Sequence, residues 1–227
     1  MAKKKYGLLF EKPKKEDYVF GAFSLVPFEI LIYKKYGLRR NYSDRFLATV
    51  VGTRGKGATP QEVCEFLRKI GVVSQETWPF DESINTEDRF FAKSPPKLYE
   101  LAAEFNREWN FKHEYVPSEH NEISKALTSS PLLISVYGWK ERNGKFYRPS
   151  GVKDNHATTM FYQRDGEFRR VFDSYDYPHI KDVEWESVPK VVKRFWIEKK
   201  TYPHMSIYLD FWRKIWYNIG KHEKHFA

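Results

Sequence analysis

The segment Asp154-Asn155-His156-Ala157-Thr158-Thr159-Met160, followed by Val171-Phe172-Asp173-Ser174-Tyr175, decides the fold of this chain. A histidine opens one β-rich run, and a carboxylate ends the next one. In an antiparallel pair these two side chains can meet across the sheet. A carboxylate that accepts from one imidazole nitrogen fixes the tautomer and leaves the other nitrogen as a base. His156 and Asp173 are therefore the candidate catalytic residues.

Helical periodicity dominates the chain before this pair. The apolar spacing predicts helices over residues 22–36, 45–51, 60–70 and 96–110. Gly37 should end the first helix, and Pro27 should kink it or move its start. Thr59 and Pro60 have the residue types of a helix cap and a first helical position. Residues 72–95 are expected to be rich in loops.

The second half of the chain has the patterns of β-structure. Strands are predicted over residues 111–116, 131–137, 156–163, 169–173 and 193–198, with a short helix over 122–128. The pairs Asn143-Gly144 and Asp165-Gly166 are typical of hairpin turns. Helices followed by strands predict an α+β domain with two lobes and a cleft between them. We expect a helical lobe over about 18–110 and a β lobe over about 111–200.

Composition limits the class of protein. The 227 residues are 41% hydrophobic and 18% aromatic, which favours a packed core over disorder. The net charge of +9 suits an anionic surface or nucleic acid, although without a nucleic-acid motif a solvated basic face is the simpler interpretation. The single cysteine, Cys64, excludes an internal disulfide and is expected to be a small buried hydrophobe. Neither a signal peptide nor a membrane span is visible, so we expect a cytoplasmic protein or one assembled into a larger particle.

The two ends of the chain differ from the rest. Residues 1–17 are basic and are expected to form an extended arm. Residues 203–221 have an apolar stripe at helical spacing that includes Trp212 and Trp216, so they predict an amphipathic C-terminal helix. This helix could dock on its own domain, enter a partner's groove, self-associate or bind a membrane surface.

Six segments resemble papain-like cysteine peptidases in the correct order along residues 13–200. They are Gly21-Ala22-Phe23-Ser24, Asn41–Leu47, Gly71–Phe80, Ile123–Val136, Asn155-His156-Ala157 and Phe172-Asp173-Ser174-Tyr175. The first resembles the family's stretch directly after its nucleophile, and the last two resemble its histidine and asparagine motifs. The resemblance implies a papain-like two-lobed fold, with cysteine, histidine and asparagine in the cleft and a glutamine that stabilises the oxyanion.

The chain departs from that pattern where the chemistry needs it most. The resemblance puts Phe20 at the nucleophile position and Lys14 near the position of the oxyanion glutamine. Asp173 stands in place of the family's asparagine. The expected base and its orienting group are therefore present, whereas the nucleophile and the oxyanion donor are replaced. Ser24 lies one helical turn beyond Phe20, roughly 6 Å along the axis, which is out of reach of His156.

These observations favour a papain-like protein without catalysis, a structural or protein-binding module. His156 and Asp173 would be relicts of the site, and Trp212 and Trp216 would dock a protein partner or assembly. Family members without disulfides or a prodomain resemble those of prokaryotic and phage genomes, so an accessory component of a phage particle is one extension. An active hydrolase with an unusual nucleophile and a nucleic-acid-associated protein are the alternatives. No cofactor or metal is expected, because His156 with Asp154 or Asp173 lacks a third ligand.

Overall fold

The computed structural model describes residues 25–54, 58–80, 84, 86–136, 139–149, 151, 156–173 and 179–201. Helices come first and an antiparallel sheet follows, so the α+β expectation is confirmed. The helices are α2 (Val26–Tyr36), α3 (Asp44–Val51), α4 (Pro60–Ile70), α5 (Glu87–Phe90), α6 (Pro96–Glu108) and α7 (His120–Ser129). The arm 1–17, Lys14, Phe20, Ser24 and the predicted helix 203–221 lie outside the described residues.

The strands form a sheet with the order β1-β8-β2-β5-β6-β7-β4-β3. Their bounds are β1 (Trp109–Tyr115), β2 (Leu132–Val136), β3 (Lys140–Arg142), β4 (Lys145–Tyr147), β5 (His156–Arg164), β6 (Phe168–Phe172), β7 (Ile180–Glu184) and β8 (Val191–Lys199). The neighbours pair antiparallel except β4 and β7, which are joined by a parallel bridge between Phe146 and Val183.

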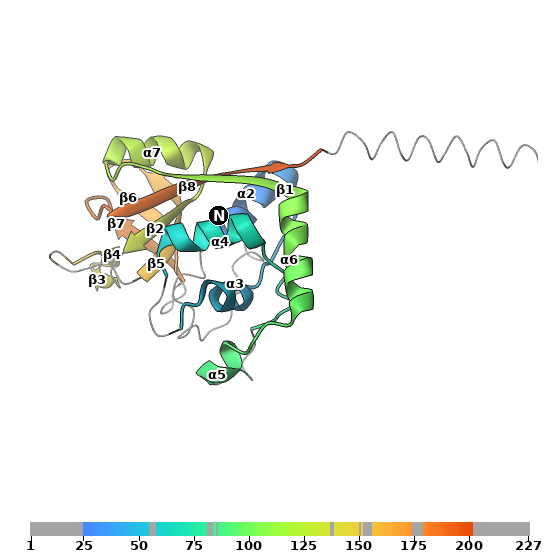
Figure 1. The fold of residues 1–227 in the computed structure, drawn as a ribbon. Helices are drawn as coiled ribbons and strands as arrows, with labels where there is room; N and C mark the ends of the chain where they lie inside the picture. The colour runs from blue at the N-terminus through green and yellow to red at the C-terminus, as the bar shows by residue number, and fades with distance from the viewer. Residues whose placement is uncertain are drawn as a thin grey trace, which may run out of the picture.

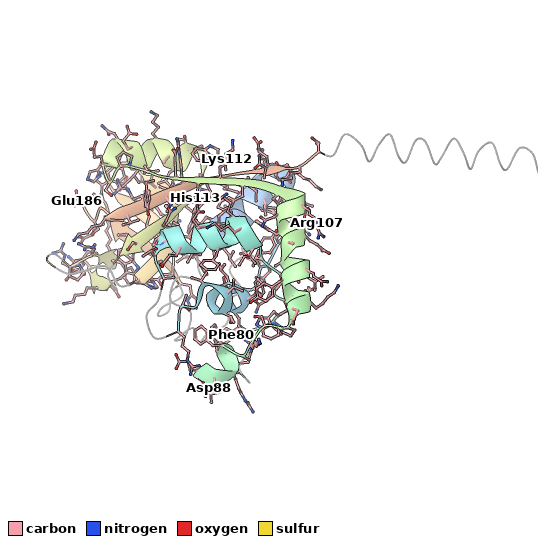
Figure 2. The ribbon with its side chains drawn as sticks, viewed as in Figure 1. Phe80, Asp88, Arg107, Lys112, His113 and Glu186 are labelled. Carbon is pink, nitrogen blue, oxygen red and sulfur yellow. The ribbon has the colours of Figure 1, made fainter. Side chains whose placement is uncertain are left out.

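Helices cover the two faces of the sheet unequally (Figure 1). On one face α2, α3, α4 and α6 pack with β1, β2 and β8 around a cluster that includes Phe28, Leu67 and Phe195. On the other face α7 packs with β2, β5 and β8 through Ile123 and Ile134. Figure 2 shows side chains filling the space between these layers. The strands β2 and β8 are therefore buried from both sides.

The helix signals predicted from the sequence are confirmed. Ser43 accepts a hydrogen bond from Phe46 N–H and caps α3. Thr59 and Glu62 form a reciprocal capping box at the start of α4. Gly37 ends α2 in the left-handed conformation with φ 69°. Pro27 lies in the first turn of α2, where its missing N–H costs no helical hydrogen bond, so it marks a start instead of a kink.

One element prediction needs correction. The helix predicted over 96–110 ends at Glu108, because Trp109 and Asn110 pair with Lys199 and Glu198 as the first residues of β1. Strand pairing with a segment far along the chain overrides the local helical spacing there. The described part of 72–95 is mostly loop, as expected, and contains the short helix α5. The strands β3, β4 and β7 had no prediction.

A single arginine fixes the irregular segment before α6. Arg45 of α3 donates through Nε to Phe90 O at 2.9 Å and through Nη1 to Pro79 O at 3.1 Å. It also donates to Arg89 O, and its guanidinium lies 4.5 Å from the Trp78 ring centroid. The planar, multiply donating guanidinium thus joins three backbone carbonyls of this segment to α3.

The described part of the chain contains no helix of the length and apolarity that a membrane crossing requires.

The close approach of α4 and α6 depends on Gly71. Its φ of 88° suits glycine, and a Cβ built there would lie 1.9 Å from the carbonyl oxygen of Ala102 on α6. We expect Gly71→Ala to lower the free energy of unfolding by about 3 kcal/mol or more, since backbone strain and a backbone clash add together. Urea unfolding followed by circular dichroism measures this change.

Gly52→Ala is the matched control. Gly52 also ends a helix at positive φ, 74°, but nothing lies within 4 Å of a Cβ built there. We expect it to cost only about 1 kcal/mol, the left-handed penalty alone. Equal losses in the two variants would refute the role given to the contact with Ala102.

Candidate functional site

The structure brings together the histidine and the carboxylate predicted from the sequence. His156 is the first residue of β5, and Asp173 directly follows β6. The Nε2 atom of His156 lies 2.8 Å from Oδ1 of Asp173. The two residues are 9% and 1% exposed. The predicted contact across the sheet is confirmed, while the relict catalytic role of the pair stays a prediction.

The direction of this hydrogen bond determines what the imidazole can do. An ionised carboxylate only accepts, so Nε2 carries the proton and Nδ1 is the nitrogen through which His156 would act as a base. The backbone also fixes Asp173, because its N–H donates to His179 O at 2.7 Å. His179 Nδ1 in turn lies 3.2 Å from the carbonyl oxygen of Asp173. The carboxylate is therefore held at a defined position.

Lys181 is a third member of this site. It lies on β7 opposite Val171, and its Nζ is 3.6 Å from Oδ2 of Asp173. The lysine is 2% exposed, and its Nζ lies 5.4 Å from the Phe146 ring centroid. A buried carboxylate is costly unless an opposite charge compensates it. Lys181 provides that charge for the aspartate that replaces the asparagine of the resemblance.

Lys181 was not predicted from the sequence. No spacing rule connects it with Asp173, and it lies on the strand that was not predicted. The available signal was its position, because Lys181 lies in a short stretch of alternating apolar and polar residues that follows Asp173 in the chain.

The first turns of α2 lie against the strands that carry the pair. Val26 and Ile30 of α2 form a small cluster with Phe161 of β5 and Phe172 of β6. The start of α2 is thus close to the candidate site, as the resemblance implied.

The only cysteine of the chain belongs to a different environment. Cys64 is fully buried on α4, and burial raises the pKa of its thiol to about 12. The nearest charges that act on it are Lys193 and Glu65, neither of which belongs to the His156 site. The expectation that Cys64 is a buried hydrophobe is confirmed. Such a thiol is not a nucleophile at neutral pH.

Among the described residues, no group of three or more His, Cys, Asp and Glu side chains could hold a metal ion. Asp154, the other ligand considered with His156, lies outside those residues.

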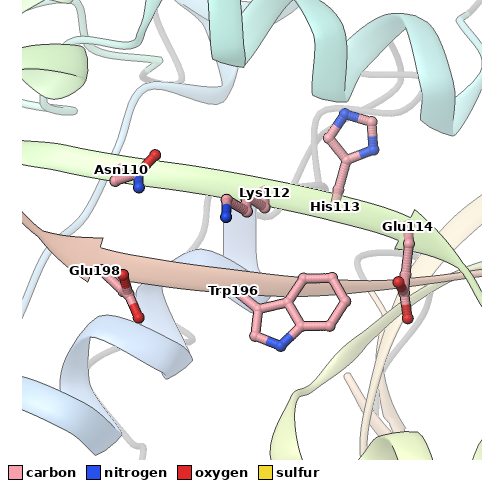
Figure 3. Close-up of a pocket in the computed structure, with 6 residues that line it drawn as sticks. All are labelled: Asn110, Lys112, His113, Glu114, Trp196 and Glu198. Atoms are coloured by element: carbon pink, nitrogen blue, oxygen red, sulfur yellow. The ribbon is translucent and has the colours of Figure 1, made fainter.

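A surface depression of about 390 Å³ lies on β1 and β8, away from this pair. The residues that line it are Asn110, Lys112, His113 and Glu114 of β1 and Trp196 and Glu198 of β8 (Figure 3). Its walls carry charges of both signs, and Arg194 is paired with Glu114. Neither His156 nor Asp173 lines this depression.

Comparison with known proteins supports the fold. No family model and no curated protein matches the sequence. Xylellain, a cysteine protease from Xylella fastidiosa, has a similar structure with a TM-score of 0.60 and 15% identity, covering 81% of this chain and 80% of its own. The bromelain protease from Ananas comosus, solved with the E64 inhibitor, has a TM-score of 0.59 and 17% identity. The match covers 88% of this chain and 97% of the bromelain chain. Digestive procathepsin L 3 of Tenebrio molitor has a TM-score of 0.59 and 11% identity. The match covers 83% of this chain and 67% of the procathepsin chain.

These similarities define the class of the fold. The chain has a papain-like α+β fold, with N-terminal helices followed by an antiparallel sheet. At this level of identity the likeness concerns the fold alone.

The charge balance of the site can be tested with two substitutions. Asp173→Asn removes the carboxylate that lies 3.6 Å from the buried Lys181 ammonium group, so we expect a loss of about 3 kcal/mol in the free energy of unfolding. Lys181→Met removes the positive charge beside the buried carboxylate and should cost a similar amount. The double variant should recover most of the loss, because neither buried charge remains.

Urea unfolding of the four proteins measures this cycle. Arg142 and Glu184, which are joined at 2.9 Å and have side chains 62% and 21% exposed, serve as the control pair. Removing either should change stability by less than about 1 kcal/mol. Additive losses at Asp173 and Lys181 would show that the two charges are not coupled.

Proposed function

We propose that this protein is a papain-like protein without peptidase activity that acts as a structural or protein-binding module. The observation that carries the proposal is the position of Cys64. It is the single cysteine of the chain, and it is buried on α4 with a raised thiol pKa. Cysteine peptidase chemistry needs a thiolate beside an imidazole, usually at a helix N-terminus.

The chemistry of the site supports the same proposal. The resemblance puts Phe20 at the nucleophile position, and a phenyl ring cannot attack a carbonyl. The His156–Asp173 contact can persist without a reaction, since a buried hydrogen bond to a carboxylate is costly to break. Asp173 also pairs with Lys181, so the carboxylate has a structural partner.

The partner in this proposal is a protein or a large assembly. Residues 203–221, with Trp212 and Trp216, would provide the docking helix, because aromatic anchors dominate many protein interfaces. An accessory component of a phage particle, or a free cytoplasmic scaffold, fits such a module.

An active hydrolase is the competing proposal. It would use His156 and Asp173 with a nucleophile other than a cysteine at the Phe20 position.

A thiol-directed epoxide probe and a serine-directed phosphonate probe together separate the two proposals. We expect the native protein to remain unlabelled at neutral pH, because the thiol of Cys64 is buried and protonated. The unfolded protein should take up one probe at Cys64, and Cys64→Ser should abolish that labelling. Intact-protein mass spectrometry measures the label.

Native labelling that His156→Ala removes would contradict the proposed loss of catalysis. A serine-directed phosphonate probe, applied in parallel, covers a hydroxyl nucleophile.

The docking role of the C-terminal residues predicts a second result. A tagged chain should co-purify with a defined partner from its native source, and Trp212→Ala with Trp216→Ala should reduce the recovered partner by about tenfold or more. His156→Ala is the control and should leave recovery unchanged. Equal recovery with the tryptophan variant would remove this segment from the interface.

Nucleic acid is the alternative partner for a chain with a net charge of +9. Binding to duplex DNA that weakens steeply with salt would favour it.

A further inference from the structure

A buried lysine lies where α4 packs against the sheet. Lys193 of β8 is fully buried. Its Nζ donates to Oε1 of Gln61 on α4 at 2.6 Å and lies 3.0 Å from Nδ1 of His113 on β1. The Tyr115 ring centroid is 3.9 Å from the same atom. One ammonium group therefore joins three elements of the fold.

The contact with Lys193 fixes the protonation state of His113. An ammonium group only donates, so Nδ1 must be the unprotonated, accepting nitrogen. The other nitrogen, Nε2, lies 3.1 Å from Oε1 of Glu65 on α4 and carries the proton. His113 is thus held as a neutral imidazole with both nitrogens engaged.

His113 has little access to water. Its side chain is 8% exposed, and its ring stacks on Phe111 with the centroids 5.5 Å apart. Figure 3 shows it pointing toward the helix side of the sheet, away from Asn110 and Lys112. An added proton could not be screened easily there.

We propose that neutral His113 helps to hold α4 against the sheet, and that its protonation in acid weakens this contact. Protonation of Nδ1 replaces a hydrogen bond with two cations in contact, His113 and Lys193. Arg68 of α4 adds a further positive charge, and it already pairs with Glu65 at 2.7 Å. Glu65 is the anion that faces His113 in this network, and one carboxylate cannot neutralise three cations.

The direction of the pH effect follows from the burial. Burial, and next the charge of Lys193, lower the pKa of His113 from its ordinary value. Burial likewise lowers the pKa of Lys193. When α4 leaves the sheet, His113 regains a normal pKa near 6.5 and takes up a proton. The closed form is therefore fully stabilised above about pH 6.5 and loses stability as the pH falls toward the lowered pKa.

Cys64 reports the opening, because it is fully buried on α4 itself. Dithiodipyridine reacts with thiols in acid as well as at neutral pH. Dividing the rate at Cys64 by the rate for the unfolded chain at the same pH corrects for the pH dependence of the reaction itself. We expect this ratio to rise by about tenfold between about pH 7.5 and about pH 5.5. One proton taken up on opening shifts the opening equilibrium by about tenfold for each pH unit below about pH 6.5.

Three variants make the test specific. His113→Gln keeps an acceptor for Lys193 and a donor for Glu65 but cannot titrate, so its ratio should stay constant. Lys193→Met removes the opposing cation and should reduce the response. His120→Gln makes the same change at a histidine on α7 and should leave the response intact. A constant ratio in the unaltered protein, or an undiminished response in His113→Gln, would overturn the proposal.

Discussion

The position of α2 on the sheet depends on three phenylalanine rings. Phe28 of α2 contacts Phe111 of β1 and Phe195 of β8, with centroids 4.6 Å apart in both pairs. Each such pair adds about 0.5–1.5 kcal/mol to the burial of apolar area. Lys35 Nζ also donates to Ile197 O at 3.2 Å, and Lys199 N–H donates to the Tyr36 hydroxyl at 2.8 Å. Because α2 is fixed along β8 in this way, its first turns lie against β5 and β6, where His156 and Asp173 meet.

The sheet also holds three buried cations, and each has a different kind of partner. Lys181 has a carboxylate, and Lys193 has an amide oxygen and an imidazole. Arg169 donates to Trp185 O at 2.7 Å, lies 4.0 Å from the Trp185 ring and contacts His120 Nδ1 at 2.9 Å. Since a buried charge tolerates few arrangements, these contacts specify how β1, β7 and α7 sit on the rest of the sheet.

Helix caps and hairpin turns could be predicted from the sequence, because they depend on residues that are close together in the chain. The caps at Ser43 and Thr59 and the hairpin turn at Asn143-Gly144 involve residues within a few positions of one another, so the residue types alone indicate them. The contact of His156 with Asp173 could also be predicted, because consecutive strands bring these residues together. Lys193 could not, since it lies 80 positions from His113 and 132 from Gln61. The end of α6 was mispredicted for the same reason: β8 decides it, and β8 is distant in the chain.

The pairing of Asp173 with Lys181 also restricts how this chain could change over evolution. An asparagine at position 173, as in the family that the sequence resembles, would remove the negative charge beside a buried ammonium group. A neutral residue at position 181 alone would remove the positive charge beside a buried carboxylate. Each single step toward an uncharged site therefore passes through a less stable protein, and the two positions must change together. A lineage that carries both charges is therefore held at a local optimum of stability.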